Sequence, residues 1–225
     1  MTDRSKTHSA SRGGRKADRS PVSRKKKLTR KDRIRQIRLR ILAAGLLILM
    51  ILILIFVRYL GLRNGRAVHL SEEVLAYQPV VEQSCKEYGI PSFSQVILAI
   101  MQQESAGQVA DVMQSSESPF NTQYSNAPGS ITDPNYSIQV GVETFAHCLD
   151  EAYCSSPADQ NGLKLALQFY NFGGDYASWA LENYGGYTPE NAAEYSLLRQ
   201  QALGWSQYGD PEYVPHVMQY YHYGL

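Results

Sequence analysis

The sequence predicts an all-α domain outside the membrane, preceded by a single transmembrane helix and a basic disordered N-terminal tail. Three observations lead to this prediction. Residues 41–57 carry no charge, residues 1–40 are strongly basic, and residues 71–225 show helical hydrophobic spacing without an alternating strand pattern. The 225-residue chain therefore divides into a basic cytoplasmic tail (1–40), a signal anchor (41–57), a stalk (58–70) and a helical domain (71–225).

Charge separates the two ends of the chain. Residues 1–40 contain 16 Lys and Arg against 3 Asp, whereas residues 67–225 contain 3 Lys and Arg against 18 Asp and Glu. The acidic balance excludes nucleic acid as a partner of the outer domain, because phosphate binding needs a basic surface. The composition of the tail favours a disordered segment that sets topology, and it leaves open contacts with anionic lipid headgroups or nucleic acid.

The uncharged run ILAAGLLILMILILIFV covers residues 41–57. As a helix its 17 residues span about 25 Å, the short end of a membrane span, and Arg40 and Arg58 can extend it by snorkelling. The following residues offer no small-x-small cleavage site, which indicates an uncleaved signal anchor in the cytoplasmic membrane. The positive-inside rule places the N-terminus in the cytoplasm and residues 59–225 outside.

Helices follow one another along the outer domain. Ser71 is a suitable N-cap for a first helix that Pro79 kinks and Gly89 ends. The run SFSQVILAIMQQESAG, residues 92–107, has the spacing of a buried helix. The next stretch, residues 108–134, is rich in Ser, Asn, Pro and Gly and predicts a long ordered loop, which in compact domains is commonly functional.

The C-terminal half predicts more helices. Helical spacing resumes in NYSIQVGVETFAHCLDEAY and again in LKLALQFYNF, which Gly173 and Gly174 close. A short helix is expected in DYASWALENYG, and another in TPENAAEYSLLRQQAL, where Thr188 is the N-cap and Pro189 is at N1. We expect the aromatic tail GDPEYVPHVMQYYHYGL to pack back on the domain.

The cysteines and histidines indicate no cofactor. The odd number of cysteines leaves open a Cys148–Cys154 bridge, but not within one continuous helix, where the side chains lie too far apart. With no CxxC pair and no cluster of histidines, the chain has no metal-ligand pattern, and we predict neither a metal site nor a cofactor.

A single glutamate stands between the hydrophobic helix and the polar loop in MQQESAGQVADVMQSSES. Glu104 falls in the last turn of the helix, so partial burial and the negative end of the helix dipole both raise its pKa. A carboxylic acid that stays protonated near neutral pH can donate a proton to a glycosidic oxygen as the bond breaks. The position alone is also compatible with an ordinary acidic residue at the end of a helix.

Four motifs support the interpretation of Glu104 as a proton donor to a glycosidic oxygen. They are ILAIMQQESAG, DVMQSSES, NYSIQVGVETFAHCL and LALQFYNFGG, in this order. The chain resembles the lysozyme-like superfamily of goose-type lysozymes and soluble lytic transglycosylases. The resemblance covers about residues 70–225, and it is greatest to the lysozyme-like domain of the CwlT-type cell-wall hydrolases of Gram-positive conjugative elements. It implies a lysozyme-like fold that acts on peptidoglycan glycan strands.

The resemblance also implies site residues. Glu104 would be the general acid and Asp111 the second acidic position, both catalytic. The residues implied to bind substrate are Gln114, Ser115, Ser116, Thr132, Glu143, Tyr170 and Asn171.

Each of these residues is expected in a particular place. We expect Gln114 to contact an N-acetyl group or the backbone, and the two serines to bind sugar or support the acid. The hydroxyl of Tyr170 is expected to approach the acid. Other roles stay open: Asp111 as a loop cap, Glu143 on a solvated helix face, Tyr170 as a core aromatic and Gln114 as loop scaffold.

The function implied is that of a membrane-anchored N-acetylmuramidase that cleaves the MurNAc-β-1,4-GlcNAc bond of a Gram-positive cell wall. Two possible second acids, Asp111 and Glu143, favour hydrolysis over a lytic transglycosylase that forms 1,6-anhydroMurNAc. The resemblance further implies local opening of the wall for conjugative transfer, with conjugation or secretion proteins as partners. A catalytically silent wall-binding scaffold is the alternative from another class. CwlT-type enzymes usually carry a downstream peptidase domain, and none follows in this sequence, which ends at Leu225.

Overall fold

The structure is a computed structural model that describes residues 29–224, with the backbone alone for residues 58–64. Most of the basic tail, residues 1–28, lies outside the described residues. Helix α1 (Arg30–Asn64) contains, at Arg30–Val57, a stretch long and apolar enough to cross a membrane, and the described part of the chain has one such helix. The chain divides into two units within this helix, between Met50 and Ile51.

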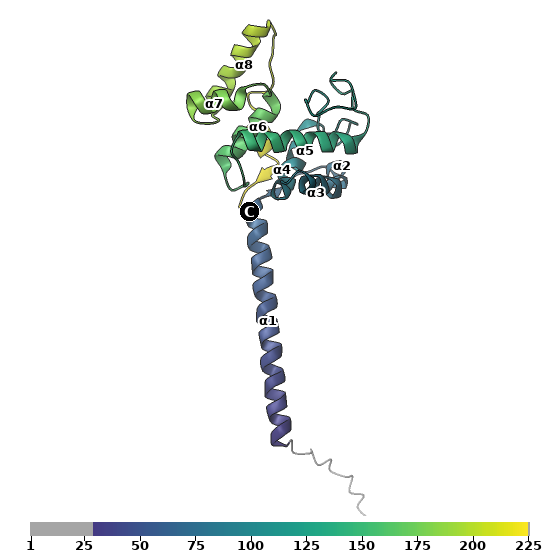
Figure 1. The fold of residues 1–225 in the computed structure, drawn as a ribbon, viewed down its shortest axis with the longest axis vertical. Helices are drawn as coiled ribbons and strands as arrows, with labels where there is room; N and C mark the ends of the chain where they lie inside the picture. The colour runs from purple at the N-terminus through teal and green to yellow at the C-terminus, as the bar shows by residue number, and fades with distance from the viewer. Residues whose placement is uncertain (1–28, 225) are drawn as a thin grey trace, which may run out of the picture. The chain divides into compact units, whose positions relative to one another are not determined.

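The remainder of the chain is helical, as the sequence predicts (Figure 1). In order, its elements are β1 (Arg66–Ala67), α2 (Glu72–Ala76), α3 (Gln78–Glu87), the 3-10 helix η1 (Pro91–Phe93), α4 (Ser94–Glu104), α5 (Pro134–Glu151), α6 (Gln160–Phe172), α7 (Tyr176–Tyr184), α8 (Pro189–Leu203), α9 (Tyr213–Met218) and β2 (Tyr221–His222).

Helix α4 forms the centre of the hydrophobic core. Its residues 96–101 are all buried, so the helix is covered on every side rather than on one stripe. Helix α4 packs against α3 and α9, α3 packs against α5, and α5 packs along α6 (Figure 1). The end of α4 is therefore anchored in the hydrophobic core.

The first predicted helix is divided in two. Ser71 caps α2 as expected, accepting a hydrogen bond from the Val74 backbone N–H at 3.1 Å. Helix α2 ends at Ala76, and α3 starts at Gln78. The break has a physical cause, because Pro79 has no N–H to donate to the carbonyl four residues earlier. Thr188 and Pro189 begin α8 as predicted, with a capping box to Asn191.

A close approach holds the long loop of residues 105–133 against α5. Gly141 lies on α5, and a Cβ atom built there would stand 2.6 Å from the Cβ of Met113 in the loop. Only a residue without a side chain lets the Met113 side chain come this near the helix. The loop is thus positioned by the helix it covers.

The C-terminal segment returns to the start of the domain. Its side chains Tyr213, Val214 and Val217 are buried, which confirms that the aromatic tail packs back. Strand β2 pairs antiparallel with β1, Arg66 opposite His222 and Ala67 opposite Tyr221. The sequence did not predict these strands, because two residues are too few to show an alternating pattern.

The three cysteines, Cys85, Cys148 and Cys154, are free and buried. Cys148 lies inside α5 and Cys154 follows its end. The Cys148–Cys154 bridge that the sequence left open is therefore not formed. Burial raises the pKa of the Cys154 thiol to about 11, so this thiol stays protonated and unreactive at neutral pH.

Residues just after α1 belong to the folded domain, and their removal should destabilise it. Ala67 N–H donates to Gln95 Oε1 at 3.1 Å, and Val68 N–H donates to the Tyr220 carbonyl at 2.8 Å. We expect a fragment that starts at Ser71 to unfold with about 2–4 kcal/mol less free energy than one that starts at Gly65, at about 1 kcal/mol for each lost hydrogen bond. Urea denaturation measures the difference.

The control is Arg66→Ala in the longer fragment. The Arg66 side chain is exposed, and this change keeps the backbone pairing of β1, so its stability should match that of the unchanged fragment. Equal stability of the fragments starting at residues 65 and 71 would contradict a structural role for β1.

Candidate active site

Glu104 is the last residue of α4, where the sequence places it, and its side chain is only partly exposed. The Tyr213 hydroxyl donates a hydrogen bond of 2.5 Å to its Oε1 atom. The pKa of Glu104 is raised to about 7: burial is the largest cause, the Tyr213 hydrogen bond acts against it, and the charges of Asp111 and Asp210 add smaller upward shifts. The result is an acid that is about half protonated at neutral pH.

Tyr213 is held in place by helix α6. Tyr170 on α6 stacks on Tyr213, with ring centroids 6.5 Å apart and planes 23° apart. Just before α9, the Asp210 backbone N–H donates to Asn171 Oδ1 at 2.6 Å, and its carbonyl accepts from Gln168 Nε2 at 2.8 Å. Two successive turns of α6 therefore position the segment that contacts the acid.

The hydroxyl of Tyr170 does not bond the acid. It donates to the backbone carbonyl of Met113 at 3.0 Å, and so ties α6 to the loop. The hydroxyl that bonds Glu104 belongs to Tyr213, which the sequence analysis did not single out. The aromatic composition of the C-terminal tail was the only hint in the sequence, and no neighbouring residue indicated which of its tyrosines contacts α4.

Asp111 is the centre of a buried hydrogen-bond network and is 2% exposed. One carboxylate oxygen accepts from Ser115 N–H at 2.9 Å and from Ser137 Oγ at 2.7 Å. The other accepts from Ser116 N–H at 3.1 Å and from Ser116 Oγ at 2.6 Å. Both oxygens are thus occupied by donors from the loop and from α5, and the cluster of serines after Asp111 serves this carboxylate.

The serines also fasten the loop elsewhere. Ser115 Oγ donates to the Ser137 carbonyl at 3.0 Å, and Ser116 Oγ accepts from Ile131 N–H at 3.1 Å. Gln114 precedes them in the left-handed region, with φ of 48°, a conformation that costs free energy for a residue with a side chain. Its Nε2 donates to the Asp111 carbonyl at 3.0 Å, and the residue is exposed.

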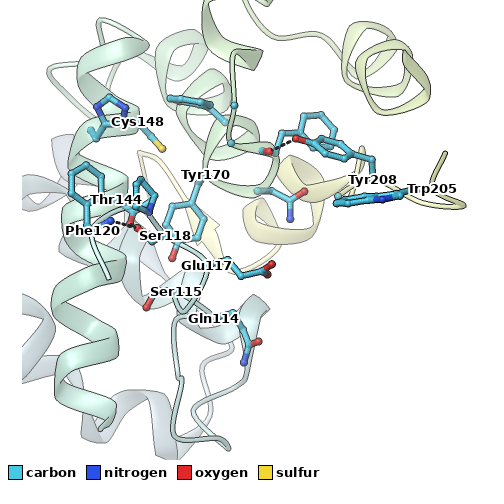
Figure 2. A pocket seen from close by; sticks show the side chains of 18 residues that line it. Gln114, Ser115, Glu117, Ser118, Phe120, Thr144, Cys148, Tyr170, Trp205 and Tyr208 are labelled. Atoms are coloured by element: carbon cyan, nitrogen blue, oxygen red, sulfur yellow. Dashed lines mark hydrogen bonds between the residues drawn. The ribbon is translucent and has the colours of Figure 1, made fainter. Parts of the chain in front are cut away.

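A cavity of about 530 Å³ lies beside this loop. Figure 2 shows Gln114, Ser115 and Glu117 on one side, with Trp205 and Tyr208 side by side farther along. Its walls come from the loop, α5, α6 and the segment after α8. The lining residues are Gln114, Ser115, Glu117, Ser118, Pro119, Phe120, Thr144, His147, Cys148, Phe169, Tyr170, Asn171, Phe172, Gly173, Gly174, Trp205, Tyr208 and Gly209.

The wall of the cavity is rich in aromatic rings. The His147 ring lies 5.8 Å from Phe120 and 5.9 Å from Phe169, measured between centroids. Glu117 is the one carboxylate among the lining residues, and it is exposed. Flat apolar faces with a few polar groups suit a sugar, whose ring has an apolar face and polar edges.

The structure brings together part of the predicted set. Gln114, Ser115, Tyr170 and Asn171 line the cavity. Glu104 adjoins them through Tyr213, which stacks on Tyr170.

Glu104 and four other predicted residues lie outside the lining. Asp111 and Ser116 are buried beneath the loop, and Thr132 is exposed on it. Glu143 faces α3, where it accepts a hydrogen bond of 3.1 Å from the Tyr88 hydroxyl. Within residues 29–224, no three His, Cys, Asp or Glu side chains gather as metal ligands do.

Comparison with known proteins gives consistent matches. The model of the family described as lysozyme-like matches residues 71–222. The chain is 37% identical over 153 residues to the bifunctional muramidase/DL-endopeptidase CwlT of Bacillus subtilis (strain 168), covering 68% of this chain and 43% of that protein. It is 33% identical over 125 residues to the uncharacterized membrane protein YocA of the same organism, covering 56% of this chain and 52% of that protein.

A solved structure also matches. It is described as similar to lipoprotein, NLP/P60 family, and comes from Staphylococcus aureus subsp. aureus Mu50. The TM-score is 0.58 at 34% sequence identity, over 69% of this chain and 54% of that chain. The chain thus spans about half the length of the relatives it matches.

The hydrogen bond from Tyr213 predicts a shift in the pKa of Glu104. Donation to the carboxylate stabilises the charged form, so its removal in Tyr213→Phe should raise the pKa above the present value of about 7. Carbon-13 NMR of the glutamate carboxyl groups against pH measures it. Tyr184→Phe is the matched control, since Tyr184 donates a 2.6 Å bond to Glu194 on the domain surface. An unchanged or lower Glu104 pKa in Tyr213→Phe would contradict the assignment.

Proposed function

We propose that this chain, which belongs to the lysozyme-like family, is a glycosidase that cleaves peptidoglycan strands with Glu104 as the general acid. The observation that carries the proposal is the raised pKa of Glu104 at a site joined to an aromatic cavity through Tyr213 and Tyr170. The muramidase named among its relatives supports the choice of substrate.

Cleavage requires a proton for the glycosidic oxygen and a water molecule to which the sugar is transferred. Glu104 donates its proton to the glycosidic oxygen while the bond from that oxygen to C1 of MurNAc breaks. Water then attacks C1 and passes a proton to the Glu104 carboxylate, which restores the acid and leaves a reducing MurNAc end. Gln114, Ser115, Tyr170 and Asn171 are proposed to contact the strand, because all four line the cavity.

Asp111 is proposed to act through Glu104. Its charge raises the pKa of the acid, and its hydrogen bonds hold the loop that forms one wall of the cavity. Ser116 supports this arrangement from beneath the loop. The substrate contacts predicted for Thr132 and Glu143 stay predictions, since both residues lie outside the cavity lining.

A lytic transglycosylase is the second candidate. Both carboxylate oxygens of Asp111 accept several hydrogen bonds, and Glu143 is bonded to Tyr88, so neither is offered to a water molecule in the cavity. A lytic transglycosylase needs no such carboxylate, because the 6-hydroxyl of the sugar attacks C1. Glu117, which is exposed on the cavity wall, favours hydrolysis instead.

We propose that α1 anchors the chain in the cytoplasmic membrane of a Gram-positive cell, with the helical domain on the wall side. The apolar stretch Arg30–Val57 and the membrane protein among the relatives support this location. Protease added to intact protoplasts should digest the helical domain and spare an N-terminal peptide that carries a tag. Protection of the helical domain would reverse the orientation.

Replacement of Glu104 should abolish cleavage. We expect Glu104→Gln to lower kcat/KM by at least about 10³-fold, equivalent to roughly 4 kcal/mol, since the amide cannot donate the proton. Activity is read as clearing in gels that contain cell walls and as products identified by mass spectrometry. Glu151→Gln is the matched control, because Glu151 also ends a helix, α5, but is exposed.

The products separate the candidates. Reducing MurNAc ends support the muramidase, whereas 1,6-anhydroMurNAc ends alone would establish the transglycosylase. No clearing by the wild-type protein would favour a silent wall-binding scaffold. A role in conjugative transfer, with conjugation proteins as partners, is proposed from the resemblance to hydrolases of conjugative elements. Normal DNA transfer by donor cells that carry Glu104→Gln would count against it.

A further inference from the structure

Arg199 on α8 is a cation without a counter-ion. It is one of three Lys and Arg residues within 67–225, a range that holds 18 Asp and Glu. Its Nε atom is buried and has no hydrogen-bond partner. Within the part of the chain that the structure describes, no carboxylate forms an ion pair with it. The residue is partly exposed, so its guanidinium can meet an anion from outside the chain.

Arg199 is packed against the wall of the cavity. Its guanidinium carbon lies 5.6 Å from the ring centre of Tyr208, and Tyr208 lines the cavity together with Trp205. These two rings are 6.0 Å apart and lie next to each other in Figure 2. Trp205 is 57% exposed, so the aromatic surface beside Arg199 is uncovered.

Hydrogen bonds fix Tyr208 at both ends. Its hydroxyl donates to the Phe172 carbonyl at 2.8 Å, which ties it to the end of α6. Its own carbonyl accepts from Ser196 Oγ at 2.6 Å, one turn before Arg199 on α8. The ring that carries Arg199 is therefore rigidly placed between α8 and the cavity, and the guanidinium is oriented by it.

The two ends of the cavity differ in charge. Glu117 lies near Gln114 and Ser115 (Figure 2), whereas Arg199 packs on Tyr208, which lines the cavity farther along. A ligand with a carboxylate is repelled at the first end and attracted at the second. Peptidoglycan has this character, since its neutral sugars carry peptides with free carboxylates.

We propose that Arg199 binds a carboxylate of the peptide attached to the glycan strand that occupies the cavity. This inference rests on the proposed function and specifies its substrate as peptide-bearing glycan. The planar guanidinium suits a carboxylate, to which it can donate two parallel hydrogen bonds. We favour a peptide over a phosphate polymer of the wall. The peptide is covalently joined to the sugar in the cavity, whereas a phosphate polymer would have to bind separately.

The test compares two substrates. Arg199→Met keeps the length and apolar packing of the side chain on Tyr208 but removes its charge. With peptide-bearing strands we expect kcat/KM to fall about tenfold through KM, whereas peptide-free strands, prepared with an amidase, should be cleaved as by the wild-type protein. Arg199→Lys should lose less, and high salt should reduce the wild-type preference. Lys86→Met, at an exposed residue of α3, controls for net charge.

Other results would overturn the inference. Equal losses on both substrates with a lowered melting temperature would mean that Arg199 only supports Tyr208, and unchanged rates on both would mean that it binds nothing. A loss that disappears once the phosphate polymers are stripped from the wall would assign the site to phosphate.

A failure of the proposed function can be told apart from these results. If the wild-type protein cleaves neither substrate, the role of Glu104 fails, and calorimetry still tests Arg199. Muramyl dipeptide should then bind about tenfold more weakly to Arg199→Met than to the wild-type protein. Equal binding would overturn the inference.

Discussion

A buried carboxylate that has no ion pair within residues 29–224 determines how the polar half of this domain is built. Asp111 accepts hydrogen bonds from two backbone N–H groups and from the hydroxyls of Ser116 and Ser137. A buried charge is tolerated only when such donors surround it. The donors come from both the loop and α5, so the charge cannot be satisfied unless the loop lies against the helix. This requirement accounts for an ordered loop where the composition alone would allow a flexible one.

The same carboxylate links folding to the candidate chemistry. Its charge is among the causes that raise the pKa of Glu104, and the loop it organises provides one wall of the cavity. The opposite side depends on the C-terminal segment, which delivers Tyr213 to the acid and then pairs β2 with β1. Residues from the beginning, middle and end of the domain thus meet around one side chain, and the site exists only in the folded chain.

The parts of the structure that could be predicted are those with local causes. Ser71, Thr188 and Pro189 mark helix starts because capping depends on residues within one turn. The raised pKa of Glu104 also follows from its place on a buried helix. Tyr213 could not be found in this way, because it is 109 residues from Glu104 along the chain. Asp111 combines local and distant contacts. The serines next to it are visible in the sequence, but Ser137, which completes its hydrogen bonds, lies 26 residues away.

The scarcity of cations around Glu104 has a chemical reason. The pKa of Glu104 is shifted by burial, by two carboxylates and by one tyrosine, and no Lys or Arg is among the causes. A lysine or arginine at this place would stabilise the anion and return the pKa toward 4.5, which would leave the acid ionised at neutral pH. The His216 ring bonds Asp210, one of the two carboxylates that raise the pKa of Glu104, at 2.6 Å. Arg199 packs on Tyr208 and is not among the groups that shift the pKa of Glu104. The acidic composition of the domain is thus compatible with glycan cleavage, because two of its carboxylates add to the effect of burial in raising the pKa of Glu104.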